Sequence, residues 1–292
     1  MELVSDYMRD DFLRHGLNAL TRETFGFDFE DWVNNGYFEG DYIPYSFLEN
    51  GEILSNASAN RMHFVQNGLR KDYIQIGTVM TRKDYRRRGL ARKLVEQIIR
   101  EYRDKCDGIY LFADLGALDF YRKIGFTQGL QYQYVLRKDC MNGPKKGPAF
   151  KPADGQNPQM KQKYRDVLRC CKINASLEQI NRFGLQMFYT SDLSDTYYAE
   201  DLDCFAVMEL SDGTVTLKSV VCRNHLSLKD IIPRIALEYD CLKLGFSPCP
   251  EDVHLFESSP FDGEEDYRLF YLGDELKKIE KERLFFPALS HA

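Results

Sequence analysis

A strand, a basic turn and a helix follow one another between Tyr73 and Tyr102, and this order limits the folds open to the chain. Residues 73–81 are rich in Ile, Val and Thr, which is typical of a strand. Residues 90–102 carry apolar side chains at the spacing of an amphipathic helix, and residues 108–113 form a second apolar run. The segment therefore predicts a β-α-β unit with the basic turn at its centre.

The elements around this unit predict a mixed sheet. A helix is expected over 12–24, and strands are expected at 43–48 and 52–64, joined by the turn residues Asn50 and Gly51. A helix near 117–123 and a last strand near 132–137 follow. A helix, antiparallel strands and then β-α-β-α-β indicate the α+β class with a mixed αβ sheet.

A segment rich in proline and glycine, residues 142–158, interrupts the chain. Proline removes a backbone donor and glycine loosens the backbone, so the segment fits neither a helix nor the interior of a sheet. For a chain of 292 residues, two domains are the natural expectation. We predict a domain over 1–141, a linker over 142–158 and a smaller α+β domain over 159–292.

The second part is predicted to repeat the order of the first. Strands are expected at 203–210 and 214–222, and a helix is expected to begin at Ser227 and run to about Tyr239, although Pro233 fits its interior poorly. Residues 242–247 (LKLGFS) are similar to residues 122–127 (RKIGFT). We interpret this short match as a sign of an internal duplication.

Composition excludes several classes of function. The net charge is −6, which disfavours nucleic acid as a partner. No apolar run is long enough for a membrane span, and the first residues do not form a secretory signal, so we expect a cytoplasmic protein without a membrane partner. The eight cysteines and five histidines lack metal-ligand spacing, so we expect reduced, mostly buried thiols and no metal.

The basic turn at 82–93 is expected to bind a small anion. The first turn of a helix presents free N–H groups and the positive end of the helix dipole. Gly89 allows a sharp turn, Ala91 allows a close approach to the helix, and the arginines add positive charge. The alternatives are a solvated basic face and a targeting peptide.

Two motifs in this region resemble those of the GNAT acetyltransferases. Arg86, Gly89 and Ala91 occupy the specified positions of the family's pyrophosphate loop, Arg/Gln-x-x-Gly-x-Gly/Ala. Residues 120–126 (FYRKIGF) resemble the family's second motif, Phe-Tyr-x-x-x-Gly-Phe. The resemblance covers about residues 1–140, and it implies the GNAT fold, in which two central parallel strands splay apart to admit acetyl-CoA.

The resemblance also implies roles for particular residues. The pantetheine arm would pair with the backbone of the strand at Val79, Met80 and Thr81. The pyrophosphate would be held at the turn by the backbone of Arg87, Arg88, Gly89, Leu90 and Ala91, with Arg86 as the motif residue. Tyr121 would donate a proton to the leaving thiolate, and Asp114 would either touch the cofactor or cap the next helix.

The acceptor site is expected near residues 23–32, where acidic and aromatic residues alternate. Glu23, Asp28, Glu30 and Asp31 are candidates for the general base, among Phe25, Phe27, Phe29 and Trp32. Such a wall suits a cationic amine with an apolar body. The alternative is an ordinary surface segment with core aromatics.

The second part lacks a pyrophosphate loop, because residues 221–227 (VCRNHLS) contain no glycine. We therefore predict a degenerate GNAT-like half that binds no coenzyme A. The tail 284–292 is apolar, which is unusual for an exposed segment. A further hypothesis is that it docks on the first domain and brings the Ala292 carboxylate or His291 near the amine.

The sequence thus predicts an enzyme that transfers acetyl from acetyl-CoA directly to an amine, with a small-molecule acceptor favoured. Acetylation of a protein lysine or N-terminus is the alternative within this class. A non-catalytic module that senses acyl-CoA is the alternative from another class. The sequence leaves the oligomeric state open.

Overall fold

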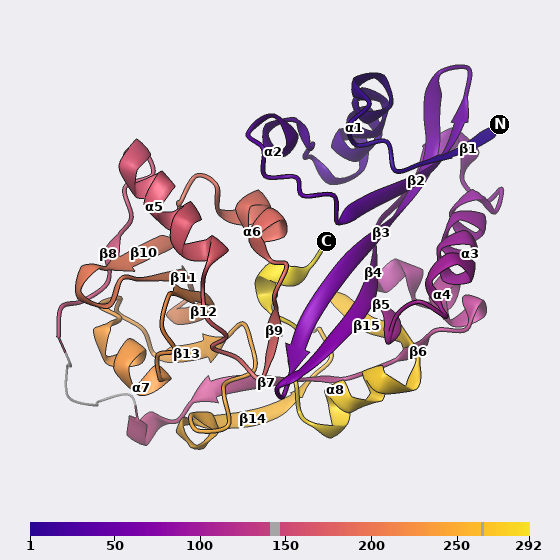
Figure 1. Ribbon diagram of the computed structural model, residues 1–292. Coiled ribbons are helices and arrows are strands. Elements are labelled where there is room, and N and C mark those ends of the chain that lie inside the picture. Colours follow the sequence, from indigo (N-terminus) through magenta and orange to yellow (C-terminus); the bar gives the residue numbers. More distant parts are fainter. Residues whose placement is uncertain (141–146, 264–265) are drawn as a thin grey trace.

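Two β-sheets lie side by side and share the chain. The computed structural model describes residues 1–140, 147–263 and 266–292. In Figure 1 the first sheet stands at the right and the second at the left, and the C-terminal residue lies between them. The first sheet has the order β1-β2-β3-β4-β5-β15-β6, with β9 beside β3, and the second has the order β14-β7-β13-β12-β11-β10-β8.

The first sheet is antiparallel except for one central pair. It contains β1 (Glu2–Ser5), β2 (Tyr42–Glu49), β3 (Glu52–Gln66), β4 (Leu69–Thr81), β5 (Gly108–Asp114), β6 (Thr127–Gln128), β9 (Leu177–Gln179) and β15 (Tyr267–Leu272). Strand β4 runs parallel to β5. The turn between β2 and β3 has positive φ at Asn50 (53°) and Gly51 (79°), which is the backbone that the Asn-Gly pair favours.

The second sheet repeats the plan of a parallel pair within antiparallel strands. Its strands are β7 (Gln131–Leu136), β8 (Lys151–Pro152), β10 (Thr196–Ala199), β11 (Cys204–Ser211), β12 (Thr214–Cys222), β13 (Cys241–Leu244) and β14 (Phe256–Phe261). Strands β11 and β12 form the predicted hairpin, and β12 runs parallel to β13. The predicted α+β class with a mixed sheet in each part is confirmed.

The two sheets exchange strands near the ends of their sequences. The strand expected at 132–137 as the last of the first part is β7, and it pairs with β13 and β14 of the second sheet. Strand β15, from the end of the chain, takes a place between β5 and β6 in the first sheet. The placement of the 132–137 strand was therefore wrong. Strand pairing across such long separations leaves no local signal, because any strand of suitable polarity pattern can fill the same edge.

Helices cover the two faces of the first sheet. Helices α1 (Asp11–Phe25) and α2 (Glu30–Asn34) lie on one side, and α3 (Leu90–Tyr102) and α4 (Leu118–Ile124) lie on the other (Figure 1). The predicted bounds of α3 are confirmed, and α1 begins at an Asp10 cap whose side chain accepts from the N–H of Leu13. The remaining helices are α5 (Pro158–Arg169), α6 (Phe183–Thr190), α7 (Leu228–Ile231) and α8 (Lys277–Lys281).

Helix α7 is much shorter than the sequence predicts. The helix expected from Ser227 to about Tyr239 ends at Ile231 and continues only as a 3₁₀ turn over Ile232–Arg234. Pro233 lies in that turn, where its missing N–H and its ring prevent a longer α-helix. Part of the predicted linker, 142–146, lies outside the described residues. Its remainder contains β8 and the Asn157 cap of α5, and the division into two domains stays a prediction.

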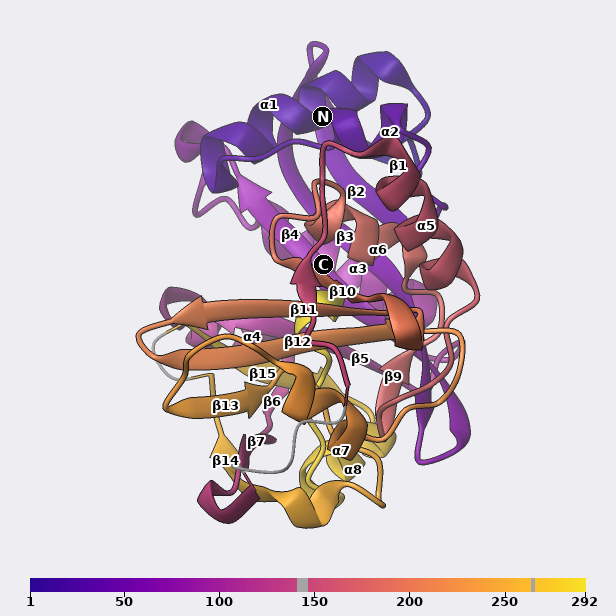
Figure 2. The ribbon, with the colours of Figure 1, turned by 90° about the vertical axis from the view of Figure 1, so that its left-hand side faces the viewer.

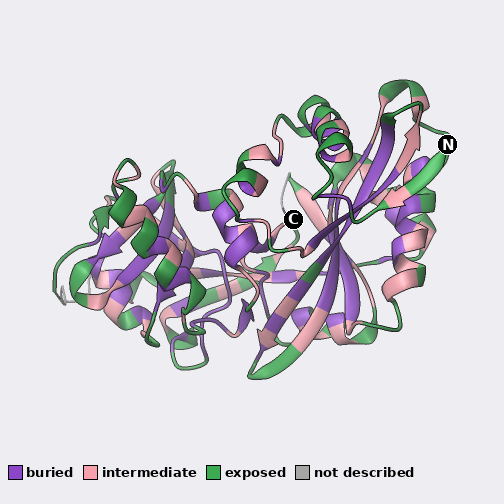
Figure 3. Cartoon of the chain, turned by 45° about the horizontal axis from the view of Figure 1, so that its top comes forward, coloured by how far each residue is buried: buried purple, intermediate pink, exposed green. Residues whose placement is uncertain are grey.

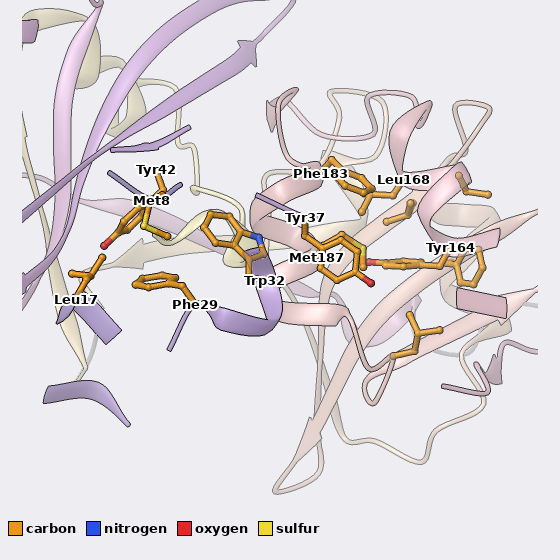
Figure 4. Packing of buried hydrophobic residues seen from close by; sticks show 14 of the residues in the cluster. Met8, Leu17, Phe29, Trp32, Tyr37, Tyr42, Tyr164, Leu168, Phe183 and Met187 are labelled. Atoms are coloured by element: carbon orange, nitrogen blue, oxygen red, sulfur yellow. The ribbon is translucent and has the colours of Figure 1, made fainter. Parts of the chain in front are cut away.

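The sheets are joined by a continuous apolar core. Figure 4 shows rings and methionines of both parts in one layer, from Met8 and Leu17 through Trp32 to Met187 and Tyr164. The indole N–H of Trp32 donates to the carbonyl of Gly184 in α6 at 2.7 Å. The central strands of both sheets are buried, as the purple ribbon in Figure 3 shows. This shared core places α6 beside α2, where a cavity opens.

Candidate active site

The parallel strands β4 and β5 separate after three residue pairs. Their register runs from Tyr73 with Gly108 to Gln75 with Tyr110 and then stops. Beyond this point β5 stays paired with β15 on its other side. A register shift against β3 accompanies Thr78, whose φ is +41°, so a bulge bends β4 away. From Ile76 to Thr81 the backbone of β4 stays paired with β3 on one side, and its other side, toward β5, faces an opening without a pairing strand among the described residues.

The basic turn leads from this opening to the N-terminus of α3. Gly89 has φ +77° and forms the cap of the helix, and the cap has no side-chain hydrogen bond. Arg88 stacks on Tyr85 at 4.6 Å and donates to the carbonyl of Asp84 at 2.8 Å, and Arg86 donates to the carbonyl of Thr81 at 3.1 Å. Two arginines thus shape the turn, while no side chain caps the first turn of α3, whose N–H groups could therefore bind an anion.

A cavity of about 730 Å³ continues from the opening to the space under α6. Of the residues predicted to bind the cofactor, Val79, Ala91 and Asp114 line it, together with Tyr121. The side chain of Met80 is buried in the apolar core. Thr81 and the turn residues Arg86, Arg87, Arg88, Gly89 and Leu90 lie outside the cavity lining, between β4 and the start of α3.

Tyr121 in α4 projects into the cavity from a buried position. It is 6% exposed and packs against Phe120, Phe126 and Phe270. Burial raises the pKa of its phenol far above the usual value, and the negative charge of Asp114 adds to this effect. The hydroxyl therefore keeps its proton at neutral pH and is a possible proton donor.

Of the segment predicted to form the acceptor wall, the aromatic residues line the cavity and the acids do not, and the role of the wall stays a prediction. Phe25, Phe27, Phe29 and Trp32 line the cavity, whereas Glu23, Asp28, Glu30 and Asp31 do not. The carboxylate of Asp28 accepts from Arg22 at 2.7 Å and from the N–H of Glu30. Glu30 accepts from Arg14 and Asn18. Asp28 and Glu30 thus cap and cross-link the helices, because partners two to sixteen residues away hold their carboxylates.

Other acids, which the sequence analysis missed, line the cavity. They are Glu39 and Asp41 before β2, and Asp266 beside Asp114 at the ends of β15 and β5. Asp41 is half-buried and its Oδ2 accepts from the amide of Asn181 at 2.8 Å. Burial raises the pKa of the Asp41 carboxyl. No motif marks these positions, since their neighbours come from distant parts of the chain.

The C-terminal tail runs into the same cavity. Phe286 is fully buried and stacks on Tyr110 at 4.3 Å, and His291 stacks on Phe112 at 3.8 Å. The N–H of Ala292 donates to Gln75 at 3.1 Å. A Cβ at position 77 would lie 2.2 Å from the carbonyl oxygen of Ala292, so Gly77 leaves the space that the tail occupies. The predicted docking of the tail agrees with this geometry, and its role in proton transfer stays a prediction.

The family of the chain follows from the region that holds the split strands and the turn. Residues 3–126 match the model of the acetyltransferase (GNAT) family. This region of the chain belongs to the GNAT acetyltransferase family. The protein is therefore a GNAT-type N-acetyltransferase, and members of this family use acetyl-CoA. The predicted recognition and enzyme class are confirmed.

Solved structures of GNAT proteins share the two-sheet architecture. Eis1 from Mycobacterium abscessus is 15% identical with a TM-score of 0.58, over 92% of this chain and 72% of that chain. A probable N-acyltransferase from Enterococcus faecalis V583 is 13% identical with a TM-score of 0.56, over 93% and 72%. A GCN5-related N-acetyltransferase from Kribbella flavida is 16% identical with a TM-score of 0.54, over 92% and 71%. At such identities the likeness shows the fold alone. Among curated proteins none matches this sequence.

The second half of this GNAT protein repeats the order of β3-β4-α3-β5 in β11-β12-α7-β13. The short sequence match between 122–127 and 242–247, which suggested a duplication, aligns a helix end with a strand end, however. Ile124 ends a helix, whereas Leu244 ends a strand. The topology, rather than this match, is the feature that the two halves share.

The eight cysteines are free thiols, as predicted, but the expectation that most are buried is wrong, because only Cys204, Cys222 and Cys249 are. Within the described residues, one group of possible metal ligands, His225, Cys249 and Glu251, has donor atoms within 4.8 Å of one another. It lies in the second half, away from the cavity, and the absence of a metal stays a prediction.

In the described part of the chain no helix has the length and apolarity of a membrane span.

Proposed function

We propose that this enzyme transfers acetyl from acetyl-CoA directly to the amine of a small molecule bound in the cavity. The observation that carries the proposal is the continuity of one cavity from the split between β4 and β5 to a chamber under α6. The volume of about 730 Å³ fits a small ligand beside the thioester arm. The second half supports the proposal because α6 and the tail cover the chamber.

The coenzyme would use the features that the sequence motif predicts. The pantetheine arm would pair with the free backbone edge at Val79–Thr81, and the pyrophosphate would accept from the backbone at Arg87–Ala91. Three features fit this group: the interrupted pairing of β4, the uncapped start of α3 and the positive φ of Gly89. Arg87 is exposed at this turn, and it adds charge without obstructing the helix terminus.

Acetyl transfer then needs one base and one acid. The neutral amine attacks the thioester carbonyl carbon, the C–N bond forms, and the C–S bond breaks to release coenzyme A. Tyr121 would give its phenolic proton to the leaving thiolate. The carboxylates that line the cavity, Asp41, Asp114 and Asp266, are the candidates to receive the proton that the ammonium loses. Holding both reactants in one cavity supplies much of the rate.

Replacing Tyr121 tests the proposal. Tyr121→Phe removes only the hydroxyl, so we expect kcat to fall by about 100-fold, while the Kd for acetyl-CoA stays within about twofold of the parent value because the phenol makes no phosphate contact. Release of free thiol over a panel of amines gives kcat, and isothermal titration gives the Kd. Tyr134→Phe is the matched control, because both tyrosines are 6% exposed and Tyr134 lies in the second sheet.

The outcomes separate the rival functions. Unchanged turnover in Tyr121→Phe would remove the acid from the mechanism. Acetyl-CoA binding without thiol release on any amine would favour an acyl-CoA sensor. Release on a lysine peptide or a protein N-terminus alone would favour a protein acetyltransferase.

A further inference from the structure

The acceptor end of the cavity is formed by rings from two distant segments. The Phe25–Trp32 segment contributes one side, and Phe188 and Tyr189 of α6 contribute the other. Phe188 lies 5.4 Å from Phe27, 6.0 Å from Phe29 and 5.9 Å from Trp32 between ring centres. The two parts of the molecule thus build one aromatic wall, and Figure 4 shows its buried members Phe29 and Trp32.

Part of this wall is more exposed than core packing requires. Phe29 and Trp32 are buried, but Phe25 and Tyr189 are each 43% exposed and Phe27 and Phe188 are half-buried. Large aromatic surfaces that remain accessible inside a cavity are typical of a site for an apolar ligand. Rings whose centres lie 5–6 Å apart present edges and faces to a ligand. Such a surface binds a planar aromatic ligand better than a flexible polar one.

The charged groups of the cavity indicate a cation. Its lining contains the acids Glu39, Asp41, Asp114 and Asp266, and Arg61 is its only arginine or lysine among the described residues. Glu39 is already paired with Arg169 at 2.9 Å. Asp41 is instead held by the amide of Asn181, so its orientation is set while its charge remains available to an ammonium group.

We propose that the acceptor is a small molecule whose amine is carried on an aromatic body, with the rings of Phe25, Phe27, Phe188 and Tyr189 around that body and Asp41 near its ammonium. The inference rests on the proposed acetyl transfer and names the substrate class of the same cavity. A linear polyamine or an amino sugar would need acceptors along its length, whereas the four carboxylates of the cavity stand outside the aromatic wall. The carboxylates stand at the edges of the wall, before β2 and at the ends of β5 and β15.

The test compares acceptors of similar charge and different bodies. Thiol release is measured with 2-phenylethylamine, tryptamine, spermidine, kanamycin and a lysine peptide, each at saturating acetyl-CoA. We expect kcat/KM for the aromatic amines to exceed the others by at least about tenfold. Acetylation of spermidine, kanamycin or the peptide with equal or greater kcat/KM would overturn the inference and leave acetyl transfer standing. Acetyl-CoA binding without release on any amine would instead reject the proposed function.

Two exposed phenylalanines of the same helix give a matched pair of variants. Phe25→Ser removes a ring from the wall, so KM for 2-phenylethylamine is expected to rise about fivefold. Phe12→Ser, at the other end of α1 and 66% exposed, should leave KM unchanged because Phe12 does not line the cavity. Equal KM values for Phe25→Ser and the parent enzyme would contradict the aromatic contact, and the exposure of both rings makes loss of folding an inadequate explanation.

Asp41→Asn tests the proposed contact between Asp41 and the ammonium group. This variant keeps the shape of the side chain and removes its charge, so KM for 2-phenylethylamine is expected to rise about tenfold. The Kd for acetyl-CoA should stay constant, since Asp41 precedes β2 and lies outside the turn at α3. A KM that does not change would exclude Asp41 as the ammonium contact and overturn that part of the proposal.

Discussion

The two crossover units of the molecule share an order of elements and differ at the start of their helices. In the first unit α3 begins at Gly89 without a side-chain cap. In the second unit the first turn of α7 is filled by the protein itself. Asp252 accepts from the N–H of Leu228 at 2.8 Å and from the hydroxyl of Ser227 at 2.6 Å, and Ser227 accepts from the N–H of Lys229. A helix N-terminus binds an external anion only when its amides are free. The N-terminus of α3 is therefore open to a ligand, whereas that of α7 is blocked by Asp252 and Ser227.

The free volume beside the parallel strand pair is likewise larger in the first unit than in the second. The first pair opens into the cavity of about 730 Å³. Beside β12, past Leu217, only about 30 Å³ remains. The N–H of Gly245 donates to the carbonyl of Leu217 at 2.8 Å, and the N–H of Ala288 donates to the carbonyl of Gly245 at 2.7 Å. The tail thus occupies the second unit with residues 287–289 and then enters the first with His291 and Ala292, between the two parts in Figure 2.

Docking of the tail is the part of this comparison with the largest expected effect on stability. Phe286 is fully buried between Tyr110 and Phe64, so Phe286→Ala is expected to lower the free energy of unfolding by about 3–5 kcal/mol. Urea denaturation measures the change. Phe12→Ala, at an exposed position, should change it by less than about 0.5 kcal/mol. A loss below about 1 kcal/mol for Phe286→Ala would mean that the tail is not docked in solution.

Removing the Asp252 carboxylate that caps α7 sharpens the comparison. Asp252 is 2% exposed, so Asp252→Ala leaves the N–H of Leu228 buried and unpaired. We expect a loss of about 1–3 kcal/mol in the free energy of unfolding. Asp252→Asn keeps an acceptor oxygen and should lose less.

Titration with acetyl-CoA then checks whether the second unit is closed by more than this one residue. We expect the affinity and the stoichiometry of the Asp252→Ala variant to match the parent enzyme, because the tail still fills the space beside β12. A second equivalent of bound acetyl-CoA would show that Asp252 alone separates the two halves.

The smallest expected change in stability concerns Gly89. A Cβ at this position meets no atom within 4 Å, but φ of +77° strains any other residue, so Gly89→Ala is expected to cost about 1 kcal/mol. Gly68→Ala is matched in both respects, with φ of +81° and open space, and lies in the turn between β3 and β4. We expect the Kd for acetyl-CoA to rise about tenfold only for Gly89→Ala, because its Cβ would stand where the phosphate approaches. Equal affinities in the two variants would place the pyrophosphate elsewhere.

Much of the first half could be predicted because its information is local. The strand, the glycine and the amphipathic helix over 73–102 lie next to one another in the sequence, and a helix start and an Asn-Gly turn depend on neighbouring residues. The aromatic segment at Phe25–Trp32 could be recognised for the same reason, since it continues directly from the end of α1, and its rings line the cavity. Its acids were misplaced because charge alone does not show which side of a loop a carboxylate occupies.

Only the tertiary structure decided which strands share a sheet and which residues complete the cavity. Strands β7 and β15 exchange places between the sheets, and Asp41, Phe188 and His291 meet across long separations in the sequence. Such contacts arise because each apolar edge and face is buried by whichever segment fits it, and loop closure over long separations adds only a small cost. The chemistry of the turn was therefore local, whereas the chamber that would select the amine came from long-range packing.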